Sequence, residues 1–342
     1  MMPKLGVSMP ILNQPLSAFP EMARAAEDAG FDAVWDYEFY RNPFLIHAMT
    51  AGTTDRIQLA TGLAITASRT PFEFANAAAD VDEASGGRLI VGMGIGASGF
   101  ADAYTGAPVD HPATRLREYI EVVKLCWKHF ATGEPVEHHG KYLDFSSPAF
   151  NPFGTRQVVR PEIPIYLAAL RPAMLKLAGE VADGVIGYMM SPSYLDDVVW
   201  PNLRAGAQRA GRDPSKITIA SETICSVSKD RAEAVRRAKI QVGVYASYPV
   251  SEPLVAQHGL QKERLAVLEG LMKEGPGCFE RVVDDKLVEA LSITGTPDEC
   301  RRKLRDFGDR LPHVIFHTPY VTPLQEDESA DAYRNIVETF AR

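Results

Sequence analysis

Residues 57–96 read IQLATGLAITASRTPFEFANAAADVDEASGGRLIVGMGIG, and this stretch decides the fold. Branched and small residues alternate along 57–65, which is typical of a strand. Thr70 and Glu73 flank Pro71 in the pattern of a capped helix start, and Ser85-Gly86-Gly87 ends that helix. A second alternating run covers 89–96. The stretch therefore predicts one strand, helix, strand unit.

Three glycines share one face of the second strand of this unit. Gly92, Gly94 and Gly96 follow Ile90 at a period of two, and glycine in a strand often marks a close approach of another group to the backbone. Two interpretations remain open, a flat ligand lying on the strand or close packing at a barrel corner. The run Gly94-x-Gly96-x-x-Gly99 formally matches a dinucleotide fingerprint, but that fingerprint must open a helix, and residues 99–106 read as a loop.

Composition excludes several classes of protein. The chain has 342 residues, 46% of them hydrophobic, and a net charge of −8 with both signs mixed along its length, so nothing suggests a nucleic-acid partner. Four cysteines are widely spaced and predict buried free thiols rather than disulfides or a zinc site. Neither a targeting signal nor a membrane-spanning segment is visible, and a cytoplasmic enzyme is the expectation.

Eight strand patterns alternate with helical ones along the chain. Parallel strands need such crossovers, and the count of eight predicts an α/β fold, a (β/α)₈ TIM barrel; an open doubly wound sheet is the alternative. We expect one domain over 1–342, with insertions at 132–163 and 247–292 that roof the active site. The predicted strands are 4–9, 33–36, 57–65, 89–96, 165–169, 184–188, 217–227 and 313–317.

The sequence predicts three further helix starts and one further helix. Ser191-Pro192, Thr296-Pro297 and Thr322-Pro323 repeat the cap and proline of Thr70-Pro71. Residues 113–131 form a helix with an apolar stripe. We therefore expect the final helix to begin at Pro323.

Barrel enzymes place their active sites at the carboxyl ends of the strands. This rule selects Pro10, Glu38, Thr61 to Leu63, Gly94 to Ser98, Ala168 to Leu170, Gly187 to Met189, Glu222 and His317.

Three of these residues could carry acid–base chemistry. Glu38 lies among aromatic residues, although it could be a surface carboxylate paired with Arg41. Glu222 lies in an apolar strand, where buried charges are usually paired, so an internal ion pair is the alternative. His317 ends the last strand, where it could act as a general acid or be a core histidine. Glu222 and His317 are the predicted catalytic residues.

A metal is not expected. His138 and His139 are adjacent, and adjacent residues on a strand point to opposite faces. No nucleophile elbow, phosphate-binding loop or zinc protease motif is present. An organic cofactor is therefore the economical explanation of the glycine face.

Several phrases together resemble the bacterial luciferase-like superfamily, especially its branch dependent on coenzyme F420, a 5-deazaflavin. The resemblance covers nearly the whole chain. The phrases are Phe31-Asp-Ala-Val-Trp35, Ala60-Thr-Gly-Leu-Ala-Ile65, Arg69-Thr-Pro71, Ser85-Gly-Gly-Arg-Leu89, Gly92-Met-Gly-Ile-Gly96, Pro164-Ile-Tyr-Leu-Ala-Ala169, Ala178-Gly-Glu-Val-Ala-Asp-Gly184 and Gly295-Thr-Pro297.

The resemblance implies a deazaflavin or flavin ring at the carboxyl end of the barrel. It also implies a non-proline cis peptide at Gly62–Leu63 behind that ring, and an acidic cofactor contact at Glu38. The remaining cofactor contacts that it implies are Thr61, Met93, Gly94, Ile95, Gly96, Ala168 and Ala169.

At two positions this chain differs from relatives in ways that bear on the reaction. Sugar-phosphate and secondary-alcohol dehydrogenases of the family carry a catalytic histidine where this chain has Phe39, and a glutamate where it has Ala97. Oxidation of glucose 6-phosphate is therefore not expected.

Three hypotheses follow. The first is an F420-dependent oxidoreductase that moves a hydride between the deazaflavin and a small organic substrate. The second is an FMN-dependent monooxygenase that uses reduced flavin and oxygen, and the third is a flavin carrier without catalytic activity. By analogy with its relatives, the chain is expected to form a homodimer or a higher homo-oligomer.

Overall fold

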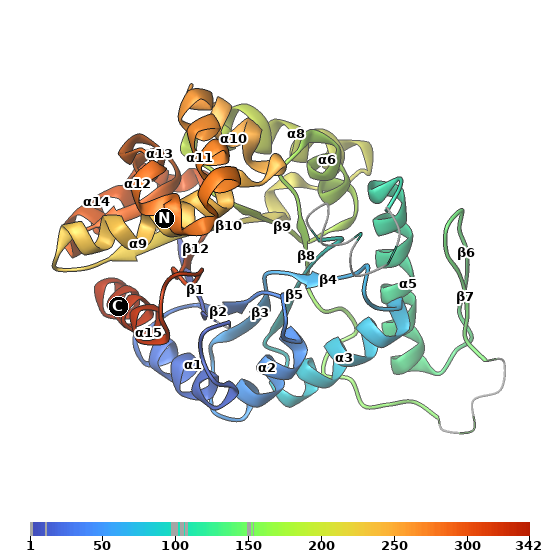
Figure 1. The fold of residues 1–342 in the computed structure, drawn as a ribbon. Coiled ribbons are helices and arrows are strands. Elements are labelled where there is room, and N and C mark those ends of the chain that lie inside the picture. Colours follow the sequence, from blue (N-terminus) through green and yellow to red (C-terminus); the bar gives the residue numbers. More distant parts are fainter. Residues whose placement is uncertain are drawn as a thin grey trace.

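Eight parallel strands close into a barrel within the part of the chain that the computed structural model describes, residues 3–10, 12–96, 102, 106, 109–148, 152 and 154–342. The ring closes because β10 pairs with both β9 and β12, while β12 pairs with β1. The barrel prediction is confirmed, and the open sheet is wrong (Figure 1). Its strands are β1 (Lys4–Ser8), β2 (Ala33–Asp36), β3 (Gln58–Thr61), β5 (Leu89–Gly94), β8 (Ile165–Ala168), β9 (Gly184–Tyr188), β10 (Thr218–Val227) and β12 (His313–His317).

Among the described residues, four short strands lie outside this ring. β4 (Ala64–Ile65) pairs with the end of β5, and β11 (Ser292–Gly295) pairs with the end of β10. β6 (Glu137–His139) and β7 (Asp144–Ser146) form an antiparallel hairpin. β11 escaped prediction because its four residues directly follow a helical pattern, without a turn signal between them.

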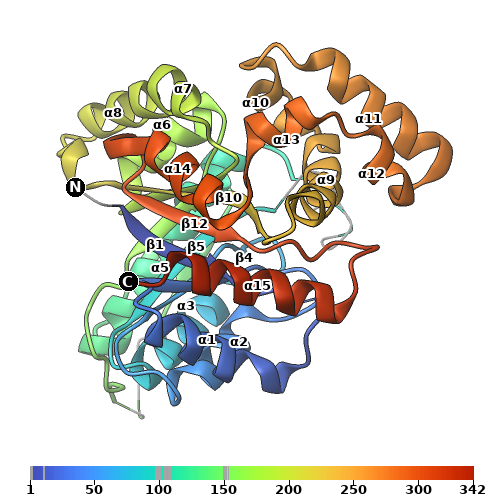
Figure 2. The same cartoon turned by 90° about the vertical axis from the view of Figure 1, so that its left-hand side faces the viewer.

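Helices surround the barrel on all sides in Figures 1 and 2. The described helical segments are η1 (Leu16–Ala18), α1 (Phe19–Asp28), α2 (Pro43–Ala51), α3 (Pro71–Ala84), α5 (Pro112–Thr132), α6 (Pro172–Val181), α7 (Pro192–Tyr194), η2 (Leu195–Val199), α8 (Trp200–Arg209), η3 (Pro214–Lys216), α9 (Arg231–Ser247), η4 (Pro249–Ser251), α10 (Glu252–Ala256), α11 (Gln261–Glu274), η5 (Pro276–Cys278), α12 (Phe279–Val282), α13 (Asp285–Leu291), α14 (Pro297–Phe307), η6 (Gly308–Arg310) and α15 (Glu326–Phe340).

Alternation along the strands divides the core into two layers. Side chains such as Trp35, Ile90 and Tyr166 fill the inside of the barrel. Leu89, Val91 and other residues of opposite parity pack outward against the helices. The inner layer is a packed plug, which leaves space for a ligand only at the ends of the barrel.

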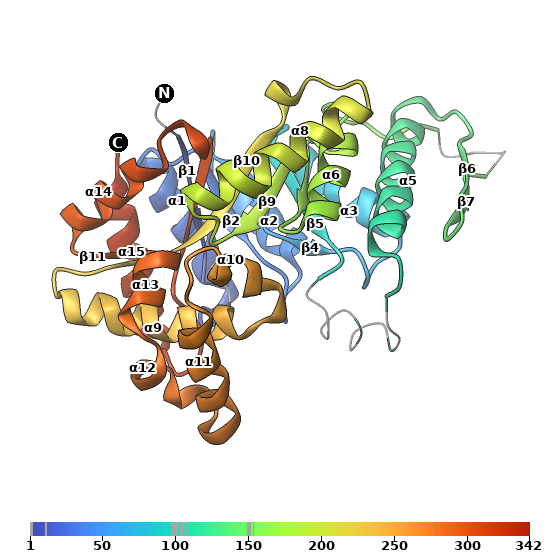
Figure 3. The ribbon, with the colours of Figure 1, turned by 90° about the horizontal axis from the view of Figure 1, so that it is seen from above.

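The two insertions have different places in the fold. Residues 247–292 contain η4 and α10 to α13. Three residues of this insertion line the cavity described below: Tyr248, Val250 and Pro276. The hairpin β6–β7 lies beyond α5, away from the barrel (Figure 3). Arg156 and Arg160 tie the end of this insertion to Asp80 and Asp82 on α3. For the described residues of 132–163, the prediction that this insertion roofs the site is wrong.

One predicted helix start is also wrong. Thr322-Pro323 does not open the last helix; the Thr322–Pro323 bond is cis, and α15 begins at Glu326 with Gln325 as its cap. By contrast, Thr70, Ser191 and Thr296 do precede helices.

Two smaller expectations can be compared with the structure. All four cysteines are free and buried, as predicted. Among the described residues, no helix combines the length and the apolar character that crossing a bilayer requires. Most of the predicted loop 99–106 lies outside the described residues, as do Ala97 and Ser98.

Candidate active site

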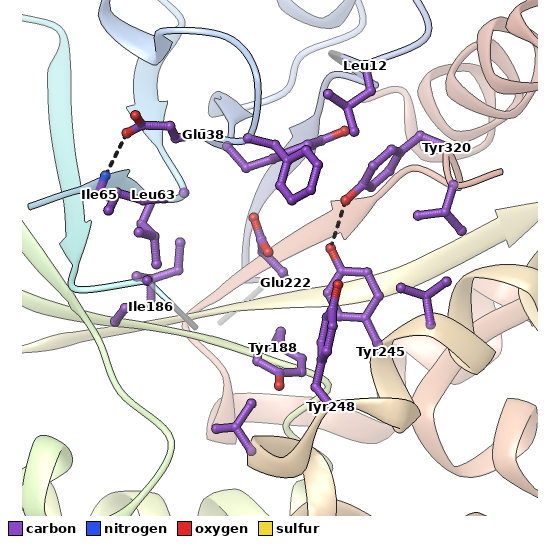
Figure 4. A pocket seen from close by; sticks show the side chains of 18 of the residues that line it. Leu12, Glu38, Leu63, Ile65, Ile186, Tyr188, Glu222, Tyr245, Tyr248 and Tyr320 are labelled. Atoms are coloured by element: carbon purple, nitrogen blue, oxygen red, sulfur yellow. Dashed lines mark hydrogen bonds between the residues drawn. The ribbon is translucent and has the colours of Figure 1, made fainter. Parts of the chain in front are cut away.

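A cavity of about 1250 Å³ lies at the carboxyl ends of the barrel strands. Glu222 stands between two different walls (Figure 4). We call the first the backbone wall: Gly62, Leu63, Ile65, Ile95, Gly96, Ala168 and Ala169. We call the second the tyrosine wall: Tyr37, Tyr188, Tyr245, Tyr248 and Tyr320.

The backbone wall arises from a break in the predicted strand 57–65. β3 ends at Thr61, the Gly62–Leu63 peptide is cis as predicted, and β4 resumes at Ala64. The break shifts the strand alternation by one residue, so that Ala64 joins Leu59 in the outer core. Leu63 and Ile65 consequently face the cavity.

The glycine face of β5 accommodates this break. A Cβ atom on Gly92 would lie 1.9 Å from the carbonyl oxygen of Thr61, and one on Gly94 would lie 2.8 Å from Cβ of Ala168. Of the three glycines, Gly96 lines the cavity, with a φ of +97°. Close packing therefore explains Gly92 and Gly94, and direct approach of a ligand remains possible at Gly96.

Glu38 holds the broken strand in place. Its Oε2 accepts hydrogen bonds from the backbone N–H of Ile65 at 2.7 Å and from Nη1 of Arg69 at 2.6 Å. The expected alternative partner, Arg41, instead donates to the carbonyl oxygen of Gln14. Glu38 lines the cavity, so it could contact a ligand while it supports the backbone wall.

Glu222 is a buried acid at the centre of the cavity. Burial, together with the nearby Asp36 carboxyl, raises the pKa of its carboxyl to about 8. Within the described chain, its Oε1 has no hydrogen-bond partner. Glu222 therefore carries a proton at neutral pH in a place that a ligand can reach.

His317 lies behind the cavity. Its Nδ1 is 3.7 Å from Oε2 of Glu222, and burial lowers the pKa of His317 to about 3. The raised pKa of Glu222 and the lowered pKa of His317 favour the uncharged form of both groups over an internal ion pair. The ring instead lies 3.1 Å from Oγ of Ser8 and 2.9 Å from Oη of Tyr245.

The structure places the predicted cofactor contacts in two groups. Glu38, Gly62, Leu63, Ile95, Gly96, Ala168 and Ala169 line the cavity, as does the predicted catalytic Glu222. Thr61, Met93, Gly94 and His317 do not line it. Thr61 donates to the carbonyl oxygen of Gly92, and Met93 is fully buried in the outer core. The geometry gives these four residues a supporting place rather than direct contact.

Sequence reasoning missed most of the tyrosine wall, because the strand-end rule selected only Tyr188, within the range 187–189. Tyr245 lies on α9 and Tyr248 follows it, and a helical pattern does not reveal which helix turns toward the barrel mouth. Tyr320 follows β12 by three residues, and strand-end position was the one signal that could have selected it. Two of these hydroxyls lie side by side, with Tyr245 Oη 3.2 Å from Tyr320 Oη.

Comparisons with known proteins agree with this architecture. The sequence model of a family described as luciferase-like monooxygenase matches residues 3–313. The chain belongs to this family. The family resemblance seen in the sequence is thereby confirmed.

The relatives that share the fold include reductases. Methylenetetrahydromethanopterin reductase of Methanolobus tindarius is 31% identical over 303 residues, which are 87% of this chain and 88% of that protein. The enzyme of the same name from Methanopyrus kandleri is 32% identical over 302 residues, 83% of this chain and 84% of that one. A solved structure of coenzyme F420 dependent tetrahydromethanopterin reductase from Methanopyrus kandleri superposes with a TM-score of 0.82 at 26% identity, covering 99% of this chain and 100% of that one.

Proposed function

We propose that this protein is an F420-dependent oxidoreductase that moves a hydride between the deazaflavin and a small organic substrate. The observation that carries the proposal is a wall of bare backbone and small side chains facing a buried, protonated carboxyl group across one cavity. Similarity to an F420-dependent reductase over 99% of the chain supports the choice of cofactor.

The residues of the backbone wall fit a flat ring. Gly62, Gly96, Ala168 and Ala169 add little side-chain bulk to this wall, and Leu63 offers an apolar contact. These residues would hold the ring, and Glu38 would fix the wall behind it. When bound, the deazaflavin supplies hydride transfer, chemistry that no side chain can perform.

Glu222 would hold and move the proton of the reaction. In the direction of substrate reduction, the protonated carboxyl donates its proton to the substrate, and in the reverse direction the carboxylate accepts one. Its unpartnered Oε1 faces Gly62, where a Cβ atom would lie 2.9 Å away. His317 is neutral at neutral pH, and its two ring nitrogens face Ser8 and Tyr245 rather than the cavity, so we assign it a positioning role toward Tyr245.

A second candidate is an FMN-dependent monooxygenase of the same family. The matched family is described as luciferase-like monooxygenase, which supports this second candidate. The barrel and the backbone wall would accommodate the deazaflavin ring or the flavin ring equally well. A binding experiment is therefore needed to distinguish F420 from FMN. Phe39 lines the cavity whichever cofactor binds, so it does not favour one proposal over the other.

Equilibrium titrations of the protein with F420 and with FMN, followed by fluorescence, test the proposal. We expect preferential binding of F420. Preferential binding of FMN, with oxygen consumption when the flavin is reduced, would establish the second candidate instead. Binding of neither cofactor would overturn both.

The variant Ala168→Leu tests the backbone wall. The larger side chain enters the space for the ring, and we expect at least a tenfold weaker affinity for F420 with an unchanged far-ultraviolet circular dichroism spectrum. Ala205→Leu, on the exposed face of α8, is the matched control. Unchanged affinity in Ala168→Leu would show that the ring lies elsewhere.

A further inference from the structure

We propose that the tyrosine wall is a binding subsite for flat, uncharged carbonyl compounds, with the Tyr320 hydroxyl as the hydrogen-bond donor to the carbonyl oxygen. The inference rests on the proposed function, because it names the substrate class of that same cavity. It is carried by a hydrogen-bonded chain that begins in the barrel and ends at the cavity.

The chain has four members. Ser8 Oγ lies 3.1 Å from Nδ1 of His317, and Nε2 of His317 lies 2.9 Å from Oη of Tyr245. Tyr245 Oη lies 3.2 Å from Oη of Tyr320. Ser8 and His317 are buried, whereas both tyrosines line the cavity. The chain therefore connects the top of the barrel with a ligand space.

The direction of the chain follows from Ser8. The hydroxyl of Ser8 accepts a hydrogen bond from the N–H of Thr318, and its own hydrogen has two possible acceptors. Nδ1 of His317 at 3.1 Å is closer than the carbonyl oxygen of Phe316 at 3.5 Å. Ser8 thus donates to Nδ1, and the neutral ring carries its single hydrogen on Nε2.

The remaining hydrogens then point outward. Nε2 of His317 donates to Tyr245, and the hydroxyl of Tyr245 donates to Oη of Tyr320. The hydroxyl of Tyr37 also interacts with that of Tyr320 and, like Tyr245, lowers the pKa of Tyr320, as a donor does. Tyr320 thus accepts from both tyrosines, and its own hydrogen points into the cavity. Burial raises the pKa of Tyr320 above its ordinary value, so this hydroxyl keeps its hydrogen at physiological pH. A carbonyl oxygen is the group that such a donor binds.

Tyr320 is held in place from both sides of its backbone. Its N–H donates to Oε1 of the fully buried Gln241 at 3.0 Å. Its carbonyl oxygen accepts from Nδ2 of Asn13 at 2.7 Å. A donor that is fixed before binding loses little entropy when a ligand arrives.

Charge on the described lining favours uncharged ligands. Arg41 and Arg171 are its cations, and each donates to a backbone carbonyl oxygen, of Gln14 and Pro249 respectively. Glu222 is protonated at neutral pH. A carboxylate placed among the tyrosines would lose its hydration, which is costly, and two further carboxyl groups, those of Glu38 and Glu326, line the same cavity.

Ring geometry favours flat ligands. Tyr37 and Tyr320 have ring centroids 4.7 Å apart with an interplanar angle of 31°, and Tyr188 meets Tyr245 edge-on at 5.5 Å. Val244, Val250 and Leu324 complete this side of the cavity. Aromatic faces beside aliphatic side chains accommodate a planar ring by stacking.

Calorimetric titration of the whole protein tests the proposal with two probes. Chromone is a flat, uncharged ketone, and chromone-2-carboxylate adds one negative charge. We expect chromone to bind at least tenfold more tightly, both without F420 and with F420 bound. Equal or tighter binding of the carboxylate would overturn the proposal, and so would displacement of chromone by F420.

Two variants locate the donor. Tyr320→Phe removes the hydroxyl but keeps the ring, and we expect chromone affinity to fall about tenfold. Tyr333→Phe is the matched control and should bind normally, because the Tyr333 hydroxyl donates to the carbonyl oxygen of Met22 and neither residue lines the cavity. Unchanged affinity in Tyr320→Phe would reject the subsite.

These titrations separate the two proposals. Chromone binding to a protein that does not bind F420 would retain the subsite and reject the cofactor. F420 binding without chromone binding would retain the proposed function and reject the subsite.

Discussion

At the scale of single residues, burial decides the chemistry of this site. Glu222 would be an ordinary carboxylate at the surface. Inside the barrel mouth, burial and the neighbouring Asp36 carboxyl favour its protonated form. The same burial makes His317 a neutral ring that links hydroxyl groups. The sequence alone left an internal ion pair open for Glu222, whereas burial favours the uncharged form of both residues.

Glu222 predicts how stability depends on pH. Its pKa rises from 4.5 in the unfolded chain to about 8 in the folded protein, so the folded state binds the extra proton between these values. The contribution of Glu222 to the free energy of unfolding is complete below about pH 4.5 and is lost as the pH rises through about 8. We expect Glu222→Gln to remove this dependence, on the order of a few kcal/mol.

Urea unfolding at a series of pH values measures this effect. Glu222→Gln should gain stability relative to the unmodified protein between pH 5 and about pH 8. Glu162→Gln, at an exposed position, should leave the pH dependence unchanged. Parallel curves for the unmodified protein and Glu222→Gln would show that the carboxyl is not protonated in the folded state.

Activity should follow the same protonation. If the buried acid donates the proton, the rate of substrate reduction should decline as the pH rises through about 8. Glu222→Gln cannot donate, and general acid catalysis of this kind contributes roughly 10²-fold to 10⁴-fold. A variant with full activity would remove Glu222 from the mechanism.

At the scale of elements, two similar tetrapeptides have different structures. Thr296-Pro297-Asp298-Glu299 opens α14, and Glu299 Oε2 accepts from both the N–H and the hydroxyl of Thr296. Thr322-Pro323-Leu324-Gln325 lies in the loop before α15, and the cap is Gln325 with Glu328. Leu324 is buried. Burial of this side chain and the path of the loop over the cavity decide where the last helix starts.

Because only one of the two threonines caps a helix, replacing each by alanine should lower the free energy of unfolding by different amounts. Thr296→Ala should lower the free energy of unfolding by about 1 kcal/mol, because it removes part of a capping box. Thr322→Ala, at an exposed position outside a helix, should change it by less than about 0.5 kcal/mol. Urea denaturation of both variants makes the comparison, and equal losses would contradict it.

At the scale of the whole molecule, the last helix completes the barrel. Phe340 on α15 stacks on Phe316 of β12, with ring centroids 4.0 Å apart and an interplanar angle of 15°. The N–H of Arg342 donates to the carbonyl oxygen of Ala29, and its guanidinium donates to that of Pro3. The two described ends of the chain therefore lie together on one side, as Figure 2 shows.

Phe340→Ala tests how much this contact stabilises the fold. Loss of a buried aromatic side chain and the cavity left behind should cost about 3–5 kcal/mol. Met272→Ala, at an exposed position of α11, should cost less than about 0.5 kcal/mol. Thermal unfolding measures both, and a small effect of Phe340→Ala would show that the barrel closes without α15.

Local patterns in the sequence determined the order and type of the elements. All eight strands of the barrel and the starts of α3, α7 and α14 were predictable, because alternation and capping are properties of neighbouring residues. Family phrases in the sequence also placed the cis bond at Gly62–Leu63, and strand-end position selected Glu38 and Glu222.

Contacts between distant segments decided the site itself. The one-residue shift after Thr61 turns Leu63 and Ile65 toward the cavity, and it fills the space beside Gly92. Tyr245 and Tyr320 meet across 75 residues, and Ser8 meets His317 across 309. Neither pairing leaves a periodic signal in the chain. Burial, which sets the protonation of Glu222 and His317, exists only once the barrel has closed, and so the chemistry of the cavity is a property of the tertiary structure.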